Sequence, residues 1–460
     1  MRHYCGRWQP GGIFTVDAVA VDMGATSVRF AHGRLIDGRI ELEVIKQTPN
    51  EPLGRCWDTS LLTAFCRSAL DFAASKNASL GIDSWGVDHG FLDSHGDLVC
   101  GPVMYRDPSH LHQYDKFSFF RKRLFELTGI AHQPFNTLYQ LAARLEEDST
   151  LPMRAQWYLM PDLMNYFLTG KRSHEQTQSS TTQLMGLDGT WCREAFELVG
   201  WPVPDQEPCP CGGIVEVVEK VPVVSVASHD TGSAVLGVGE LRPNDAYLNV
   251  GTWALLGNVL ERPCASSAAE EGGWTNEWGF GGAIRFLKNI PGFYVVNRLH
   301  RELGVNTSVG EWLQSRNTAF RGRFNVQDTS LYNPESMPMA CNAIVSVVPT
   351  SLEDWAQAAL ASLVECIASD VPKLASTTGR TIDRIRVVGG GSRSVAFCQA
   401  LADETSVDVV SGPVEATVLG NLALQFVATG QIRPENLSRT VSNSVKTVTY
   451  QPEGAPSASI

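Results

Sequence analysis

Short runs of apolar residues alternate along the chain with longer stretches in which apolar positions recur every three or four residues. Residues 18–22 and 27–30 read as two extended segments joined by a turn, so we predict a β-hairpin with Gly24 at its tip. The apolar spacing over 59–74 is typical of an amphipathic helix. Residues 80–86 then read as a buried strand that opens into a glycine loop. Strands that alternate with helices predict an α/β domain.

The same arrangement returns about half a chain later. Residues 246–252 form a strand-like run that ends in a small-residue turn, and 253–256 continue it, which indicates an internal duplication. Apolar positions in 351–375 fall on one side of a long helix, and 385–388 read as a strand directly before a glycine triplet. We therefore expect the second half to be α/β as well.

Length and turn chemistry divide the chain. A chain of 460 residues exceeds what one hydrophobic core usually serves, so two domains are expected. The polar, turn-rich segment 239–245 marks the boundary between them. We predict an N-terminal domain over 1–241, a C-terminal domain over 242–449 and a flexible tail over 450–460.

Composition narrows the class of partner. Hydrophobic residues make up 43% and charged residues 19% of the chain, as in ordinary globular proteins. The net charge of -12 and the lack of a basic run argue against a nucleic-acid partner. No stretch approaches the roughly 18 apolar residues that cross a bilayer, so no membrane partner is expected. The irregular spacing of 11 cysteines and the missing secretory signal favour reduced thiols in the cytoplasm.

The first turn has the chemistry of a phosphate loop. Backbone N–H groups at Gly24, Ala25 and Thr26 can form a concave anion site, where glycine permits close approach. Asp22 would then face the phosphates through Mg²⁺, which keeps most of its waters and needs only one or two carboxylates. Arg29 can reach phosphate oxygens as a charged donor. A hairpin turn with a surface Asp is the alternative interpretation.

The glycine triplet Gly389-Gly390-Gly391 is a second candidate nucleotide contact. Without side chains, this backbone can pack flat against a planar group such as adenine, although a purely structural turn explains the triplet equally well. The spacing of glycines matches neither the Rossmann fingerprint nor the GxxxxGK[ST] loop, so both of those nucleotide folds are excluded.

Asp230 is the candidate general base. It follows the apolar run 221–226, and α/β proteins place their sites just past strand ends. An Asp takes a hydroxyl proton effectively only late, as the oxygen attacks phosphorus, which suits a loose phosphoryl-transfer transition state. His229 would donate a hydrogen bond to substrate, and Thr231 would fix the carboxylate. Because 231–234 resembles a helix start, Asp230 can alternatively be a helix N-cap.

Other polar and aromatic residues are candidate sugar contacts. Trp85 and Asp88 can form one wall of a sugar pocket, and Asn289 offers an amide to hydroxyl groups. Trp85 in a protein core is the alternative. Cys209 and Cys211 lack the further Cys or His ligands that a zinc site needs, so no metal is expected there.

Taken together, these motifs resemble those of the FGGY carbohydrate kinases, over about residues 18–449, and the loop 82–88 is most similar to that of the members that act on L-rhamnulose. The segments that carry the resemblance are 22–29, 82–88, 105–107, 134–141, 160–162, 181–184, 226–231 and 412–421. The resemblance implies two actin-like, ribonuclease-H-like domains with ATP and sugar in the cleft between them. It also implies transfer of phosphate from ATP to the C1 hydroxyl of a 2-ketose, with L-rhamnulose favoured.

The resemblance also assigns roles by position. Asp230 is implied to be the catalytic base and Asp22 the carboxylate on the Mg²⁺ side. The implied sugar contacts are Gly86, His229, Thr231 and Asn289. The implied ATP contacts are Ala25, Thr26, Ser27, Val28, Arg29, Thr252, Asn297, Gly389, Gly390 and Gly391.

Five positions depart from the family pattern: Val28, Asn297, Glu270, Ser394 and His89. We expect the changes on the ATP side to alter ATP affinity modestly, whereas His89 lies beside the predicted sugar wall and bears on the identity of the ketose. The alternatives are a kinase for L-fuculose, D-ribulose or D-xylulose, and a non-catalytic sugar sensor on the same fold. We expect a monomer or homodimer whose partners are the ketose and ATP.

Overall fold

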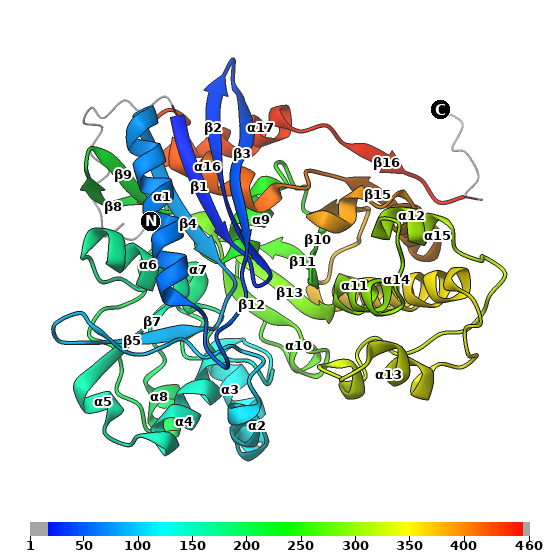
Figure 1. Cartoon of the computed structure of the whole chain (residues 1–460), viewed down its shortest axis with the longest axis horizontal. Helices are drawn as coiled ribbons and strands as arrows, with labels where there is room; N and C mark the ends of the chain where they lie inside the picture. Colours follow the sequence, from blue (N-terminus) through cyan, green and yellow to red (C-terminus); the bar gives the residue numbers. More distant parts are fainter. Residues whose placement is uncertain (1–16, 454–460) are drawn as a thin grey trace. The chain divides into compact units, whose positions relative to one another are not determined.

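The computed structural model describes residues 17–453 (Figure 1). Their strands are β1 (Asp17–Met23), β2 (Ser27–Ile36), β3 (Arg39–Pro49), β4 (Ala78–Ser84), β5 (His89–Asp93), β6 (Leu98–Cys100), β7 (Ala155–Leu159), β8 (Gly213–Val218), β9 (Val221–Ser225), β10 (Asp245–Val250), β11 (Trp253–Leu260), β12 (Thr275–Trp278), β13 (Ile284–Pro291), β14 (Arg384–Val388), β15 (Asp408–Ser411) and β16 (Val448–Tyr450). They form a six-stranded sheet in the order β3-β2-β1-β4-β9-β8, a seven-stranded sheet in the order β12-β13-β11-β10-β14-β15-β16, and a small sheet in the order β6-β5-β7.

Helices follow or separate most of these strands. Their bounds are α1 (Thr59–Lys76), α2 (Leu111–Phe117), α3 (Arg121–Thr128), α4 (Thr137–Glu147), α5 (Leu151–Arg154), α6 (Met160–Thr169), α7 (Gln176–Ser179), α8 (Arg193–Val199), α9 (Asp230–Gly237), α10 (Ser267–Glu271), α11 (Phe293–Glu302), α12 (Val309–Gln314), α13 (Met337–Ile344), α14 (Leu352–Thr378), α15 (Val395–Thr405), α16 (Ala416–Ala428) and α17 (Leu437–Ser444). Within residues 17–453, none of them combines the length and apolar character that a bilayer-spanning segment needs.

The two large sheets repeat one strand pattern. β1 pairs antiparallel with β2 and parallel with β4, while β10 pairs antiparallel with β11 and parallel with β14. In both sheets the next strand, β9 or β15, continues the parallel part. This correspondence supports the internal duplication that the sequence indicates.

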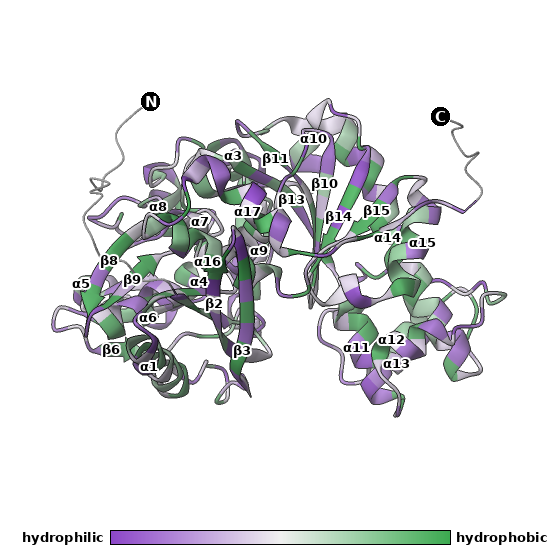
Figure 2. Ribbon diagram, turned by 90° about the horizontal axis from the view of Figure 1, so that it is seen from above, coloured by the Kyte–Doolittle hydropathy of each residue, from purple (hydrophilic) through white to green (hydrophobic). Residues whose placement is uncertain are grey.

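Local pattern predicts the first hairpin and the long helices well. The Gly24 amide donates to the Ser27 carbonyl at 2.9 Å, which closes the predicted turn between β1 and β2. Helix α1 begins at the predicted residue, capped by Asp58, whose carboxylate accepts from the Leu61 amide. Helix α14 and strand β14 also lie where their apolar patterns predict them. Figure 2 shows hydrophobic and polar residues mixed along β14, as its sequence requires.

The chain separates into two compact units that are not continuous in sequence. The first contains the described residues up to Glu240 together with Leu260–Phe286 and Thr417–Ser444. The second contains Leu241–Val259, Leu287–Ala416 and the described residues from Val445 onward. The predicted division into domains over 1–241 and 242–449 stays a prediction. Of the predicted tail, Tyr450 ends β16, and residues 454–460 lie outside the described part of the chain.

Helix α16 is tied to the six-stranded sheet by buried polar side chains. The Gln425 amide donates to the Val19 carbonyl at 2.9 Å and accepts from the Ser79 hydroxyl at 2.7 Å. The Asn421 amide donates to the Asp83 carboxylate at 2.6 Å. Because buried polar groups are costly unless they are hydrogen-bonded, these contacts fix how the helix lies on β1 and β4.

Two buried carboxyls in the first unit make stability depend on pH. Burial raises the pKa of Asp88 to about 7 and that of Asp162 to about 8, from an ordinary 3.8. The folded chain therefore binds protons that the unfolded chain has already released. Their contribution to stability is fully present below pH 3.8 and is lost as the pH rises through 7 and 8.

We therefore expect the thermal midpoint to fall as the pH rises from about 4 to about 8 and to level off above that. The free energy of unfolding should decrease by up to about 1.4 kcal/mol per pH unit for each carboxyl between its unfolded pKa of 3.8 and its folded pKa. Asp88→Asn, which has no proton to lose, should show a flatter dependence in thermal melts at matched ionic strength. A variant that is as steep as the wild type would contradict this origin.

Candidate active site

Asp230 lies at the start of α9, a few residues past the end of β9. His229 is the N-cap residue of that helix, with an extended backbone, and makes no capping hydrogen bond through its side chain. Asp230 is the first helical residue, so the alternative interpretation of Asp230 as an N-cap is wrong. The Thr231 hydroxyl donates to Asp230 Oδ1 at 3.1 Å, as predicted for a residue that fixes the carboxylate. The Asp230 side chain keeps 30% exposure and is accessible to a ligand.

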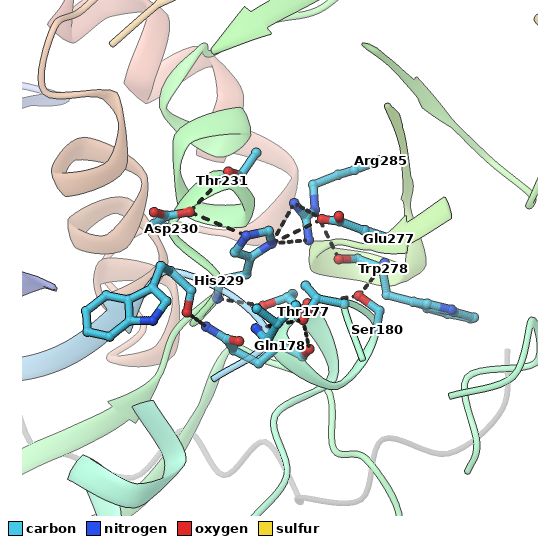
Figure 3. A network of polar contacts seen from close by, with 12 residues as sticks. Thr177, Gln178, Ser180, His229, Asp230, Thr231, Glu277, Trp278 and Arg285 are labelled. Atoms are coloured by element: carbon cyan, nitrogen blue, oxygen red, sulfur yellow. Dashed lines mark hydrogen bonds and ion pairs between the residues drawn. The ribbon is translucent and has the colours of Figure 1, made fainter. Parts of the chain in front are cut away.

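His229 and the glycine loop after β4 lie against Asp230. His229 Nε2 is 3.4 Å from Asp230 Oδ1 (Figure 3). A side chain at Gly86 would put its first carbon 3.3 Å from His229 Nε2 and 3.2 Å from Thr181, so glycine leaves room there. Four predicted residues, Gly86, His229, Asp230 and Thr231, are thus brought together within the first unit.

The loop that carries His229 is held by a set of buried hydrogen bonds. Glu175 Oε2 accepts from the Ser228 hydroxyl at 2.6 Å and from the Ser228 amide at 3.2 Å. The Gln178 amide donates to the carbonyls of Ser228 and Trp85, each at 3.1 Å. The His229 amide donates to Thr177 Oγ1 at 3.1 Å. These contacts fix the loop after β4 and the loop before α9 to the same short helix, α7.

The residue that follows Gly86 has an unusual backbone. Val87 has a φ of 70°, a conformation that β-branched residues rarely adopt. Its carbonyl accepts from the Thr137 hydroxyl at 2.7 Å, and its amide donates to Thr181 Oγ1 at 3.3 Å. Strain of this kind persists only where the surroundings determine it, and it clusters at ligand-binding sites.

A second layer of charge lies behind His229. Glu277 Oε2 is 3.1 Å from His229 Nδ1 and 2.9 Å from Arg285 Nη1. Both terminal nitrogens of Arg285 lie 3.2 Å from His229 Nδ1, and its Nε donates to the Trp278 carbonyl at 3.1 Å (Figure 3). Arg285 is 1% exposed. Burial acts to raise the pKa of Glu277, but the positive charge of Arg285 opposes it, and that pKa is lowered.

Three carboxylates approach one another on this side of the six-stranded sheet. Burial raises the pKa of Asp230, and the charge on Asp22 raises it further, against the opposing effect of His229. Burial and Asp22 also raise the pKa of Asp83 well above its ordinary value. Asp22 and Asp83 are partners in the parallel register of β1 and β4. A base in these surroundings holds a proton more readily than a solvated Asp does.

Asp22 is paired with Arg29, its cross-strand partner. Arg29 Nε and Nη2 donate to the same oxygen, Asp22 Oδ2, at 2.9 and 2.7 Å. Within residues 17–453, no three His, Cys, Asp or Glu side chains are grouped so as to hold a metal ion. The hard oxygens of Asp22 fit Mg²⁺ that is otherwise coordinated by water and phosphate.

The remaining residues of the first turn differ in accessibility. Thr26 is exposed, and Ala25 and Ser27 are half-buried, so their backbone groups lie at the surface of the turn. Val28 is fully buried and pairs with Met23 across the hairpin. Any contact of Val28 with a nucleotide therefore depends on its backbone.

Trp85 and Asp88 make a buried polar cluster. Asp88 Oδ2 accepts from Trp85 Nε1 at 2.8 Å and from Trp57 Nε1 at 2.6 Å. Both residues of the predicted sugar wall are buried, and their polar atoms are used inside the protein. His89, also buried, has ring contacts with Phe91 and with Trp157.

The other predicted residues belong to the second unit. Gly389 has a φ of 80°, and a side chain there would meet Asn249 Oδ1 at 2.9 Å. At Gly391 it would meet Val250 at 2.5 Å, so close packing on β10 accounts for two of the three glycines without a ligand. Gly390 leaves space, since its nearest neighbour is 4.0 Å away.

The side chains predicted to contact substrate or ATP in this unit lie on separate elements. Thr252 lies in the turn after β10, and its carbonyl accepts from the Tyr294 amide at the start of α11. Asn297 is exposed on α11, and Asn289 is half-buried on β13. These residues are placed within their own unit, and their roles stay predictions.

Sequence reasoning missed Glu175, Glu277 and Arg285. Each is a charged residue that is at least nine-tenths buried, and each contacts the loop around His229 from a distant segment. Their segments carry no motif, because the partners that make their burial favourable are supplied by the fold. The one available signal is a charged residue between apolar neighbours in a strand-like run, as at Arg285 between Ile284 and Phe286 in β13.

Comparison with known proteins identifies the family. Residues 246–429 match the model for the C-terminal domain of the FGGY family of carbohydrate kinases. The chain is 34% identical to the rhamnulokinase of Enterococcus faecalis, covering 94% of each chain. It is 34% identical to that of Bacteroides thetaiotaomicron and 31% identical to that of Bacillus subtilis, in each case covering 94% of this chain and 95% of the relative.

Solved structures confirm the predicted fold class. A xylulose kinase from Lactobacillus acidophilus superimposes with a TM-score of 0.78 at 17% identity, covering 95% of this chain and 94% of that one. The glycerol kinase of Plasmodium falciparum with ADP gives a TM-score of 0.77 at 13% identity, with the same coverage. The fold is that of two α/β domains of the actin-like type. Together with the full-length relatives, these findings show that the chain is a sugar kinase and belongs to the FGGY family of carbohydrate kinases.

Proposed function

We propose that this kinase transfers the terminal phosphate of ATP to the C1 hydroxyl of a 2-ketose, and that the ketose is L-rhamnulose. The observation that carries the proposal is the Asp230 carboxylate, which is partly exposed, hydrogen-bonded to Thr231 and flanked by His229. A base beside a donor is what a hydroxyl nucleophile needs, because its oxygen must be oriented and its proton taken.

In the proposed reaction, Asp230 accepts the proton of the C1 hydroxyl as that oxygen attacks the γ-phosphorus of ATP. The new bond joins the sugar oxygen to phosphorus, and the bond between the γ-phosphorus and the bridging oxygen breaks, so that ADP leaves. The raised pKa of Asp230 makes it a better acceptor than a solvated Asp. His229 and Thr231 position the sugar, with Gly86 and Asn289 as further contacts.

ATP is proposed to be bound by the turn at Ala25–Arg29, by Thr252, Asn297 and the triplet Gly389, Gly390 and Gly391. Mg²⁺ bound with ATP neutralises charge on the phosphates. We propose that a carboxylate oxygen of Asp22 is the protein ligand of this Mg²⁺. The space beside Gly390 supports approach of a ligand at that point of the triplet.

The three relatives described above are rhamnulokinases, and each shares about a third of its residues with this chain over nearly its whole length. This similarity supports the choice of L-rhamnulose. Stereochemistry is read by a few buried polar groups, and an enzyme that hydrogen-bonds a substrate hydroxyl discriminates strongly against sugars that lack it. We therefore expect a clear ranking among ketoses.

Purified protein with Mg²⁺ and ATP should phosphorylate L-rhamnulose with a kcat/KM at least about tenfold above those for L-fuculose, D-ribulose and D-xylulose. ADP release coupled to NADH oxidation measures the rates, and ¹³C NMR of the product identifies C1 as the phosphorylated carbon. A preference for another ketose would change the proposed substrate but leave the proposed kinase reaction in place. Phosphate at another carbon would overturn the proposed chemistry.

A further inference from the structure

We propose that Glu277 and Arg285 form a positioning pair that fixes the His229 imidazole as a neutral ring with its proton on Nε2. In this state His229 presents an N–H donor beside Asp230, and the ring cannot turn or exchange its proton for the other nitrogen. The use of this donor toward a sugar oxygen rests on the proposed function, whereas the state of the ring does not.

The first step of the argument is the contact between Arg285 and His229. Both terminal nitrogens of the guanidinium lie 3.2 Å from His229 Nδ1, with geometry suited to hydrogen bonds. A guanidinium is always protonated and can only donate. Two donors aimed at one ring nitrogen require a lone pair there, so Nδ1 is unprotonated and a neutral ring carries its proton on Nε2.

Glu277 balances the charge without changing this assignment. Its Oε2 lies 3.1 Å from Nδ1 and 2.9 Å from Arg285, yet within residues 17–453 it makes no directed hydrogen bond. Burial acts to raise the pKa of Glu277, but the charge on Arg285, 2.9 Å away, lowers it and favours the ionised carboxylate. The carboxylate therefore compensates Arg285, which would otherwise be an unpaired charge in a buried position.

The pair is itself held rigidly. Arg285 Nε donates to the Trp278 carbonyl at 3.1 Å, and the Trp278 amide donates to the Ser180 hydroxyl at 3.0 Å. The backbone amide of His229 itself donates a hydrogen bond to Thr177 Oγ1. Figure 3 shows the ring between the Glu277–Arg285 pair on one side and Asp230 on the other. Side chains fixed from two directions define one ring orientation.

The consequence appears at the opposite ring nitrogen. Nε2 lies 3.4 Å from Asp230 Oδ1 and next to the space left by Gly86. An N–H there attracts the Asp230 carboxylate and offers a hydrogen bond to a substrate oxygen. A bare Nε2 would instead present a lone pair to the carboxylate and to a sugar hydroxyl oxygen. The buried pair thereby determines whether the site accepts an oxygen at this point.

Nitrogen NMR tests the state of the ring without any need for activity. Protein labelled with ¹⁵N-histidine is compared with His229→Asn, whose missing signals assign the ring. We expect the two nitrogen shifts of a neutral, Nε2-protonated imidazole at pH 7.5, and in Arg285→Met a shift toward the Nδ1-protonated or cationic ring facing Glu277. An Nδ1-protonated or cationic ring in the wild type, or an unchanged ring in the variant, would overturn the proposal.

Kinetics then tests the consequence for the sugar. Arg285→Met should raise the KM for the ketose by about tenfold or more while the KM for ATP stays within about twofold, as expected when one substrate contact is lost. Arg285→Lys keeps the positive charge but lacks the two terminal nitrogens of the planar guanidinium. Its KM for the ketose should therefore stay above the wild-type value. Equal changes in both KM values would argue against a positioning role.

A matched control separates positioning from loss of stability. Arg384 donates to Asp245 at 2.9 and 2.6 Å, also as a partly buried ion pair, in the second unit. Arg384→Met removes a comparable pair away from His229. It should lower the thermal midpoint and leave both the His229 nitrogen shifts and the ratio of the two KM values unchanged. If the NMR result holds and no ketose is phosphorylated, the proposed function fails and the ring assignment stands.

Discussion

Replacing Asp230 by Asn is expected to lower kcat for the ketose by roughly 10²- to 10⁴-fold, the range that a general base contributes. The amide is nearly isosteric with the carboxylate and keeps an oxygen that can accept from the Thr231 hydroxyl, which lies 3.1 Å from Asp230 Oδ1 in the wild type. It has no basic oxygen to take the proton from the attacking hydroxyl. Binding of the sugar should change far less than turnover, because the neighbouring donors remain.

Three measurements make this test decisive. Single-turnover assays report the chemical step, calorimetry reports ketose affinity, and a thermal melt shows whether the variant is folded. Asp188→Asn provides a matched control, because the same change is made at an exposed turn of the first unit, where the carboxylate accepts from the Thr190 amide and hydroxyl. A folded Asp230→Asn enzyme that retains more than about a tenth of wild-type kcat would remove Asp230 from the role of base.

The second large effect is expected at Gly420, in helix α16. A side chain there would place its first carbon 1.9 Å from the Ser233 carbonyl oxygen and 2.9 Å from the Gly237 amide nitrogen, both in the backbone of α9. Backbone atoms cannot move aside as a flexible side chain can. Gly420→Ala must therefore push α9 away from α16, at a cost of about 1–3 kcal/mol or more.

Helix α9 begins with Asp230, so the same displacement should also reduce catalysis. We expect a thermal midpoint several degrees below the wild type, together with a loss of kcat of at least about tenfold, since small misplacements of a catalytic group are costly. Gly310→Ala in α12 is the control, because a side chain there meets nothing within 4 Å and should be neutral or slightly stabilising. A Gly420→Ala protein as stable as the wild type would show that the helices tolerate separation.

Those parts of the fold whose signals are local could be predicted from the sequence. The β1–β2 turn, helices α1 and α14 and the strand before the glycine triplet follow from periodicity and turn residues. The return of Thr417–Ser444 to the first unit has no such signal, because it depends on side-chain partners such as Ser79 and Asp83 that are far away in sequence.

The residues of the candidate site also differ in whether the sequence predicts them. Asp230, His229 and Thr231 are adjacent in sequence, so their grouping follows from the chain itself, and Gly86 joins them through the pairing of neighbouring segments. The buried pair Glu277 and Arg285 could not be predicted, because charged residues become favourable in an interior only when partners from other segments surround them.

The discontinuous first unit has a consequence for biosynthesis. A ribosome emits the sheet strands β1 and β4 early, but α16, which hydrogen-bonds to both, emerges only after more than 400 residues have been translated. Until then Asp83 and the Val19 carbonyl lack their Asn421 and Gln425 partners. The nascent chain therefore cannot complete this unit before α16 has left the ribosome, and until then its apolar strands are open to aggregation.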